Sequence, residues 1–397
     1  MALPTRRPSL PPAARNPFEF GRELSPDELV DRAAELDQLI RTIENADKLF
    51  LIGPRRYGKT SLLHAAQALA ESRGIVVLRY DAERYESLDL LAEALLTGAA
   101  RALAGPIDRT GDLLARVAAK LKPHVTYDVS NQQLSLSLGI ERNTATELPI
   151  LADVLDTVEK LASNAKRRVA VILDEFQHVV EERGAAAERQ IRAVVQRHRH
   201  VGYIFAGSAT RLLADMTSDS GRAFYKLGAR LFIGPLPAEE FKAFLDAGFA
   251  DAKLKSTPEG VDAILELAEE VPYSVQRLAH ACWEMLRVEP ARQLDRDAVN
   301  AALLQVLMQE NPAYTQLWNS LTQVQKRAAK AVVLERGLAL QSADVSRRYR
   351  IPTASMQKAL GALDRRGVIR EEALVGRVRW RLEDPLFGAW LRMAQQL

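Results

Sequence analysis

An eight-residue stretch places two glycines, a lysine and a threonine at the spacing of a phosphate-binding loop. It lies between the apolar run Lys48–Ile52 and a helical pattern from Thr60 to about Ser72, and it fits G-x-x-x-x-G-K-[ST]. In that setting, successive backbone N–H groups and a helix N-terminus would point at the phosphates of ATP. Lys59 would add a positive charge at the β- and γ-phosphates, and the hydroxyl of Thr60 would bind Mg²⁺. The nucleotide-binding residues expected here are Gly53, Pro54, Arg55, Arg56, Tyr57, Gly58, Lys59, Thr60 and Ser61.

A second apolar run, Val169–Leu173, ends in the two carboxylates that such a loop requires. We expect Asp174 to hold Mg²⁺ through water and Glu175 to polarise the water that attacks the γ-phosphate. An acidic pair at a strand end is common by itself. Together with a phosphate-binding lysine about 115 residues earlier, it predicts hydrolysis of ATP rather than binding alone.

A third polar position follows the apolar run Val201–Ala206, which ends in Gly207 and Ser208. A polar residue on a strand between the two motif strands could orient the attacking water. Serine at a strand end is also ordinary turn chemistry. The predicted catalytic set is therefore Lys59, Glu175 and Ser208.

The elements that must hold these residues follow from the hydrophobic pattern. Apolar runs without alternation, separated by helical patterns, predict an α/β fold with a parallel sheet covered on both faces. The runs are Lys48–Ile52, Ile75–Tyr80, Arg168–Leu173, Val201–Ala206 and Leu231–Ile233. Helical patterns begin at Ser25-Pro26-Asp27-Glu28 or span 60–72, 86–104, 148–165 and 187–198. Alternation with period two around Ser130-Asn131 predicts a β-hairpin inserted at about 124–140.

Composition and pattern divide the chain into four segments. Residues 1–17 hold five prolines and three arginines but no acid, so we expect a flexible tail. Residues 18–236 form the predicted P-loop core. Residues 237–312 show only helical patterns, which Asn311-Pro312 then breaks, and residues 316–397 form the last unit.

The last unit has the pattern of a winged helix-turn-helix. A short helix begins at Ser342, 350–353 reads as a turn, 354–366 is an amphipathic helix, and 367–370 with 378–382 would form the wing. Side chains suited to groove and phosphate contact are Gln357, Lys358 and Arg365 on the second helix and Arg377, Arg379 and Arg381 on the wing. A winged helix that docks to protein instead is the alternative.

Charge is unevenly distributed along the 397 residues, whose net charge is +3. From Leu321 onward there are 15 bases and 7 acids, giving +8, whereas the rest has 39 bases and 44 acids, giving −5. A basic end predicts a polyanion such as duplex DNA as its partner. No apolar run approaches the ~20 residues that span a bilayer, the N-terminus lacks a secretory pattern, and Cys282 is the single cysteine. We therefore expect a soluble, cytoplasmic protein that does not contact a membrane.

Several strings along nearly the whole chain resemble one family. They are Asn16-Pro17-Phe18, Val30-Asp31-Arg32-Ala33-Ala34-Glu35-Leu36, Leu173-Asp174-Glu175-Phe176-Gln177, Gly207-Ser208, Phe224-Tyr225-Lys226-Leu227-Gly228, Gly234-Pro235-Leu236-Pro237 and Asp384-Pro385-Leu386-Phe387. They are similar to the archaeal-type ATPases of the STAND/AAA+ group and, more distantly, to origin-recognition initiators. The resemblance implies an AAA+ core that uses ATP and Mg²⁺, an all-α lid and a winged helix. It adds Asp31, Arg32 and Pro272 to the nucleotide-binding residues.

Two features of the sequence depart from the pattern of that family. Glu269 and Glu270 stand where glycines usually precede the lid proline, and Tyr273 stands where initiators place a nucleotide-sensing arginine, one turn before Arg277. Lys226 stands where relatives often have arginine. These departures bear on nucleotide sensing by the lid and on activation by a neighbouring subunit, and they leave the core site intact.

The resemblance also implies ATP sites shared between subunits of a homo-oligomer, with a neighbour's cation beside the γ-phosphate. The candidates are Arg222, Lys226 and Arg230, and an ordinary basic surface on a slow monomeric switch is the alternative. The sequence thus predicts an ATP-driven switch whose winged helix engages duplex DNA. The second hypothesis is a signalling or scaffold ATPase whose winged helix binds a protein client.

Overall fold

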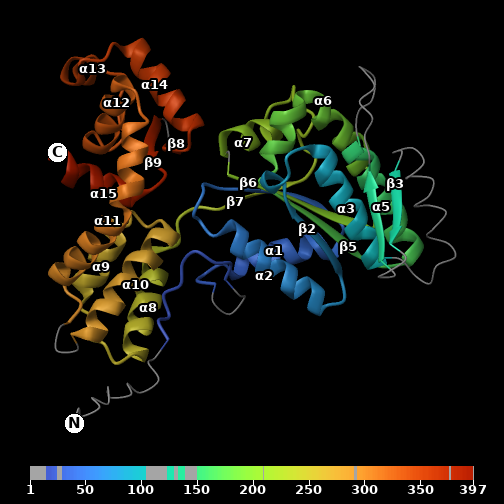
Figure 1. Ribbon diagram of the computed structural model, residues 1–397, viewed down its shortest axis with the longest axis horizontal. Coiled ribbons are helices and arrows are strands. Elements are labelled where there is room, and N and C mark those ends of the chain that lie inside the picture. The colour runs from blue at the N-terminus through green and yellow to red at the C-terminus, as the bar shows by residue number, and fades with distance from the viewer. Residues whose placement is uncertain are drawn as a thin grey trace, which may run out of the picture. The chain divides into compact units, whose positions relative to one another are not determined.

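The computed structural model describes residues 15–24, 29–103, 123–128, 133–138, 150–208, 210–289, 293–374 and 377–396. The chain divides into two compact units (Figure 1). One is Glu23–Gly234, and the other joins Met1–Arg22 to Pro235–Leu397. Residues 1–14 of the expected tail, the expected cap at 25–28 and the hairpin turn lie outside the described residues.

The unit Glu23–Gly234 is built on a parallel sheet in the order β2-β5-β6-β1-β7. Each strand pairs in parallel with its neighbour. The strands are β1 (Lys48–Ile52), β2 (Val76–Asp81), β5 (Val169–Asp174), β6 (Val201–Gly207) and β7 (Ala229–Phe232). Every residue of β5 and β6 is buried, which explains their uninterrupted apolar sequences. The predicted α/β fold is confirmed, and β6 lies between the two motif strands β1 and β5.

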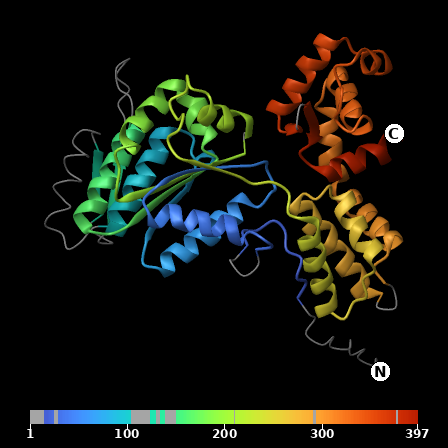
Figure 2. The ribbon, with the colours of Figure 1, turned by 180° about the vertical axis from the view of Figure 1, so that it is seen from behind.

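Helices cover both faces of this sheet (Figure 2). They are α1 (Ala33–Glu44), α2 (Lys59–Ser72), α3 (Leu88–Leu103), α5 (Ile150–Ala165), α6 (Gln177–Val195) and α7 (Thr210–Ser218), with a short 3-10 turn η2 (Ala82–Arg84). The core under α3, α5, α6 and α7 contains packed phenylalanine rings, among them Phe50 and Phe205, whose centres are 5.1 Å apart. The helix expected from residue 25 begins at Ala33 instead, and α7 was not predicted.

A hairpin is inserted between α3 and α5, as the period-two pattern predicts. Its strands β3 (Pro123–Asp128) and β4 (Gln133–Leu138) pair antiparallel, with Pro123 opposite Leu138. It forms a separate two-stranded sheet.

The other unit is mainly helical. Its elements are α8 (Ala238–Asp251), α9 (Pro258–Leu267), α10 (Pro272–Val288), α11 (Arg296–Asn319), α12 (Gln323–Leu334), α13 (Ala343–Tyr349), α14 (Thr353–Arg365), β8 (Ile369–Leu374), β9 (Arg377–Leu382) and α15 (Pro385–Ala394). Strands β8 and β9 pair antiparallel. Within residues 316–397, the predicted last unit, the helices α12, α13 and α14 are thus followed by the hairpin β8–β9. Residues 16–20 belong here too, because the ring of Phe18 packs 4.8 Å from that of Phe249.

The helix break expected at Asn311-Pro312 is wrong, because α11 continues through Pro312 to Asn319. Proline removes one backbone hydrogen bond, so tertiary contacts must stabilise the helix there. The indole of Trp390 in α15 donates to Asn311 Oδ1 at 2.9 Å, and the Tyr314 hydroxyl donates to Asp384 Oδ2 at 3.0 Å. Helix α11 therefore joins the segments on either side of Pro312 as one continuous element.

Candidate active site

The loop between β1 and α2 has the backbone that its glycines allow. Gly58 caps α2 with a φ of +83°, in the left-handed region that favours glycine. A Cβ on Gly53 would lie 2.7 Å from the carbonyl oxygen of Ile233, so no larger residue fits there. Ile233 is held in place because its N–H donates to Ile52 O at 2.8 Å. Strand β1 and the residue after β7 together fix the start of the loop.

Lys59 and Thr60 are the first two residues of α2 and directly follow the loop. Lys59 is only 5% exposed, and its Nζ donates to Pro54 O at 2.9 Å across the loop. The Thr60 hydroxyl donates to Asp174 Oδ2 at 3.1 Å. The two motifs, far apart in sequence, therefore meet at one edge of the sheet, although β6 separates their strands β1 and β5.

The pKa values of the two carboxylates at the end of β5, Asp174 and Glu175, are shifted in opposite directions. Burial and the adjacent charge of Glu175 raise the pKa of Asp174, although Lys59 opposes this. Burial would also raise the pKa of Glu175, but Lys59 and hydrogen bonds from Gln177 and Ser208 outweigh it and lower that pKa. Glu175 has a φ of +48°, an uncommon left-handed conformation for a residue with a side chain. Backbone strain of this kind clusters at functional sites.

Ser208 contacts Glu175 directly, from the end of the strand between the two motif strands. Its N–H and its hydroxyl both donate to Glu175 Oε2, at 3.1 and 2.8 Å. Gln177, the first residue of α6, donates to the same oxygen from Nε2 at 2.6 Å. Sequence reasoning assigned no role to Gln177. The sequence holds no clear signal for it, because Gln177 begins a helix whose next residues include His178 and Glu181 and so reads as an ordinary polar helix residue.

The donor set of Thr60 and Asp174 fits a magnesium ion. Both supply oxygen atoms, which Mg²⁺ prefers, and the two oxygens lie 3.1 Å apart beside the loop. The neutral hydroxyl and the carboxylate match the usual practice of holding Mg²⁺ with few protein ligands plus phosphate oxygens.

The remaining residues predicted to bind nucleotide surround this loop. Tyr57 is buried, and Ser61 Oγ accepts the N–H of Leu24 at 3.2 Å. Arg55 is exposed and reaches Ser208 Oγ at 3.4 Å. Arg32, which precedes α1, donates to the carbonyl of Gly234 at 2.6 Å. Arg56, with a φ of +69°, and Asp31, with a φ of +39°, both have left-handed backbones.

Pro272 belongs to the other unit, where it begins α10. Arg277, one turn later, forms an ion pair with Glu310 and lies over the ring of Phe20, 5.8 Å from its centre. The ring of Tyr273 packs against the same phenylalanine, with centres 6.0 Å apart. Both lid candidates for sensing nucleotide thus have partners within their own unit.

The three candidate cations for a shared site differ in what they contact. Arg222 forms a two-pronged ion pair with Glu188, a residue of α6 that is fully buried. Arg230 donates to the hydroxyl of Ser218. Lys226 is exposed and lies 5.1 Å from the centre of the Tyr225 ring. Arg222 is therefore the least available of the three, because moving it would leave a buried carboxylate without its partner.

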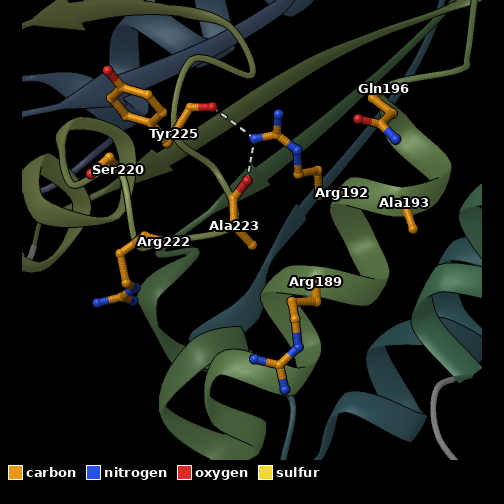
Figure 3. Close-up of a pocket in the computed structure, with 8 residues that line it drawn as sticks. All are labelled: Arg189, Arg192, Ala193, Gln196, Ser220, Arg222, Ala223 and Tyr225. Carbon is orange, nitrogen blue, oxygen red and sulfur yellow. Dashed lines mark hydrogen bonds between the residues drawn. The ribbon is translucent and has the colours of Figure 1, made fainter.

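A hollow of about 410 Å³ lies beside Arg222, between α6 and the chain that follows α7 (Figure 3). Figure 3 shows the guanidinium of Arg192 turned toward the backbone carbonyls of Ala223 and Tyr225, to which it donates. Glu188 and Arg192 lie one helical turn apart on α6 and both hold residues 222–225. Two of the arginines that line the hollow thus fix this loop.

The residues proposed to contact DNA fall into two groups. Gln357, Lys358, Arg365 and Arg377 are exposed. Arg381 is not available as expected, because it donates to the carboxylate of Glu269 at 2.8 Å and its side chain is only 13% exposed. Arg379 donates to Arg336 O at 3.1 Å. The three wing arginines are two residues apart and therefore lie on one face of β9, and the sequence alone could not tell how much of that face another part of the chain covers.

The sheet order, the loop after β1 and the acidic end of β5 define a P-loop ATPase of the AAA+ class. A family model described as an ATPase domain predominantly from Archaea matches residues 29–278. The chain belongs to this ATPase family. No curated protein matches the chain at a significant level. Among the described residues, no helix is long and apolar enough to cross a membrane.

Solved structures share the fold over nearly the whole chain. A Walker-type ATPase of Pyrococcus abyssi is similar with a TM-score of 0.59 at 18% identity, covering 95% of this chain and 99% of that one. The ORC2 protein of Aeropyrum pernix, in ADPNP–ADP complexes, has a TM-score of 0.55 at 15% identity, covering 96% and 99%. The predicted resemblance to archaeal AAA+ ATPases is confirmed at the level of family and fold.

Proposed function

We propose that this ATPase is a molecular switch whose hydrolytic site consists of Lys59, Thr60, Asp174, Glu175 and Ser208. The observation that carries the proposal is the meeting of Thr60 with Asp174 and of Ser208 with Glu175 at the ends of three neighbouring strands. In this account Lys59 leaves the carbonyl of Pro54 to contact the β- and γ-phosphates of ATP. Glu175 polarises the attacking water, and Ser208 holds Glu175 in place.

Thr60 and Asp174 would hold Mg²⁺, which when bound neutralises charge on the phosphates. The N–H of Glu175 donates to Asp174 Oδ1 at 3.0 Å, so the orientation of one carboxylate depends on the backbone of the other. The exposed side chain of Arg55, whose Nε lies 3.4 Å from Ser208 Oγ, would also contact the nucleotide. Arg56, Tyr57 and Ser61 would complete the loop around the phosphates.

We infer that nucleotide state passes between the two units through the chain that connects them. Pro235 follows Gly234 directly, and the carbonyl of Gly234 accepts a hydrogen bond from Arg32. Asp31 and Arg32 would contact the nucleotide on the same side as this connection. A change in the hydrogen bond between Arg32 and Gly234 would alter the path of the chain that leads to the lid. Pro272 is the residue of the lid proposed to contact the nucleotide.

The partner proposed for the basic end of the chain is duplex DNA, bound by residues 316–397 as a winged helix. Supporting features are the three helices followed by a hairpin, the net charge of +8 from Leu321 onward, and the exposure of Gln357, Lys358, Arg365 and Arg377. Phosphate contacts by such side chains supply sequence-independent affinity.

A protein client is the second candidate for the same domain. The observation that favours it is that Arg379 and Arg381, two of the three wing arginines, already have partners within the chain. A wing with fewer free cations suits a protein surface as well as a DNA backbone. Both candidates are compatible with a homo-oligomer.

ATP turnover measured with and without duplex DNA separates these functions. A DNA-engaging switch is expected to change its rate on addition of DNA, whatever the sequence of the duplex. Turnover that depends on Mg²⁺ but does not respond to DNA would favour the protein client. Absence of turnover under all these conditions would contradict the proposed site.

A further inference from the structure

The side-chain amide of Gln177 is buried beside the proposed base and is only half satisfied. Gln177 is 4% exposed, and its Nε2 donates to Glu175 Oε2 at 2.6 Å and approaches Ser208 Oγ at 3.4 Å. Its Oε1 is buried without a hydrogen-bond partner. That oxygen packs against Gly207, where an added Cβ would lie only 2.2 Å from it.

The orientation of this amide is set by Glu175. A carboxylate oxygen only accepts, so the NH₂ group and not the carbonyl must face it. The carbonyl of Gln177 then has to face Gly207, where nothing donates to it. A buried acceptor left unpaired carries a free-energy penalty that a leucine or methionine of similar size would avoid. The amide is therefore explained by what its NH₂ group does for Glu175.

The hydrogen bonds to Glu175 are all made by one of its two oxygens. Ser208 N, Ser208 Oγ and Gln177 Nε2 donate to Oε2. No hydrogen bond from a described residue reaches Oε1, and Glu175 is partly exposed rather than buried. Three donors, two from the residue that follows β6 and one from α6, hold this oxygen of the carboxylate in place. They leave Oε1 as the oxygen that a water can reach.

We propose that Gln177 is a positioning residue: together with Ser208 it holds Glu175 Oε2, so that Oε1 receives the proton of the attacking water. This inference rests on the proposed role of Glu175 as the base. Gln177 contacts neither nucleotide nor water in this account. It acts only through Glu175, and Gly207 is required because any side chain there would displace the amide.

The test is a double-mutant cycle between Gln177→Leu and Glu175→Gln, measured by single-turnover hydrolysis and by direct titration of ATP binding. Gln177→Leu should bind ATP with unchanged affinity and should lower kcat by about 10-fold to 10²-fold, the cost of a misplaced catalytic group. In the Glu175→Gln background the same substitution should cost nothing further. A residue that merely supports the fold would lower turnover in both backgrounds.

Gln190→Leu is a matched control. Gln190 lies on the same helix, and its Oε1 is also buried without a partner, but it makes no contact with Glu175 in the described structure. It should keep full kcat. Full turnover in Gln177→Leu, or an equal loss in both backgrounds, would overturn the proposal. If Glu175→Gln itself retains turnover, the proposed function fails instead, and the two failures are distinguishable.

Discussion

Arg381 in β9 forms a close ion pair with Glu269, the residue three positions before Pro272. Its guanidinium donates to Glu269 Oε2 at 2.8 and 3.1 Å and also to the carbonyl oxygen of Glu269 at 3.1 Å. Glu269 and Glu270 both have left-handed backbones, with φ of +48° and +57°. The two glutamates thus occupy a conformation suited to glycine, and one of them uses it to hold the hairpin β8–β9.

We predict that Glu270→Gly stabilises the protein. Glu270 is exposed and makes no described side-chain contact, so glycine would relieve a left-handed conformation at no loss. Glycine also gives the unfolded chain more conformational freedom, which offsets part of this effect. The free energy of unfolding should therefore rise by about 0.5–1 kcal/mol. Urea unfolding of the full chain measures it. Glu269→Gly is the matched comparison: it loses the pair with Arg381 and should gain less. A destabilised Glu270→Gly would contradict this explanation.

Salt dependence of DNA binding tests the basic end residue by residue. Lys358→Gln and Arg377→Gln should each reduce the slope of log K against log salt by about 0.9, the value of one phosphate contact. Arg381→Gln should leave the slope unchanged because its guanidinium is held by Glu269. Point substitutions are preferred to truncation at 316, since α11 continues to Asn319.

Two outcomes of the salt titration would contradict the DNA interface as described. An equal change of slope in Arg381→Gln would mean that its ion pair opens on binding. Affinity of the intact chain no tighter than about 10⁻⁴ M at physiological salt, the weak limit of non-specific binding, would favour the protein client.

Mixing variants tests for a cation supplied by a neighbouring subunit. Lys59→Ala subunits, whose own site is inactive, are combined with subunits that lack Lys226 or Arg230. If the cation acts between subunits, hybrid sites should regain turnover. An arginine in that role is worth about 10³–10⁵ in rate, and a lysine less because it is a point charge. A turnover rate that is simply proportional to the amount of intact monomer, and that shows no further dependence on protein concentration, would exclude a shared site.

Arg222 serves as the contrasting case in this experiment. Because Arg222 pairs with the buried Glu188, Arg222→Ala should destabilise the protein, by about 3–5 kcal/mol if the pair behaves as a buried one. Arg222→Ala combined with Glu188→Leu should recover much of that loss. Loss of turnover without loss of stability in Arg222→Ala would instead assign the cation to this residue.

Glu159 is expected to make stability depend on pH. Burial would raise its pKa, but the N–H groups of Arg199 and His200 and the His200 ring outweigh burial and lower it. In the unfolded chain the pKa of a glutamate is about 4.3, and in the folded protein that of Glu159 is lower. The carboxylate therefore stabilises the folded protein above about pH 4.3, and this contribution is lost as the pH falls through the folded pKa. Glu159→Gln should therefore cost about 1–2 kcal/mol at pH 7 and nothing in strong acid. A difference independent of pH in urea unfolding would contradict this.

The fold and the centre of the site could be predicted because local chemistry dictates them. Gly58 must take a positive φ, Lys59 and Thr60 begin a helix, and an apolar strand ends at Asp174. None of these depends on distant contacts. The position of Ser208 between the motif strands followed from the same logic of parallel strands.

What could not be predicted depends on tertiary contacts. Pro312 ends a helix by local rules, but Trp390 and Asp384 support α11 through it. Gln177 reads as an ordinary helix residue until β6 places Ser208 and Gly207 beside it. The direction of Arg381 depends on Glu269, a residue 112 positions away. Pairings of this kind are set by packing and not by the pattern around each residue.

The comparison of nucleotide binding with turnover in Lys59→Ala and Glu175→Gln tests the central claim most directly. Lys59→Ala should lose ATP binding. Glu175→Gln should bind ATP with Mg²⁺ like the unaltered protein, but hydrolyse it about 10²-fold to 10⁴-fold more slowly, the usual weight of a positioned base. Unchanged turnover in Glu175→Gln would contradict the assignment of the base and with it the proposed hydrolytic site.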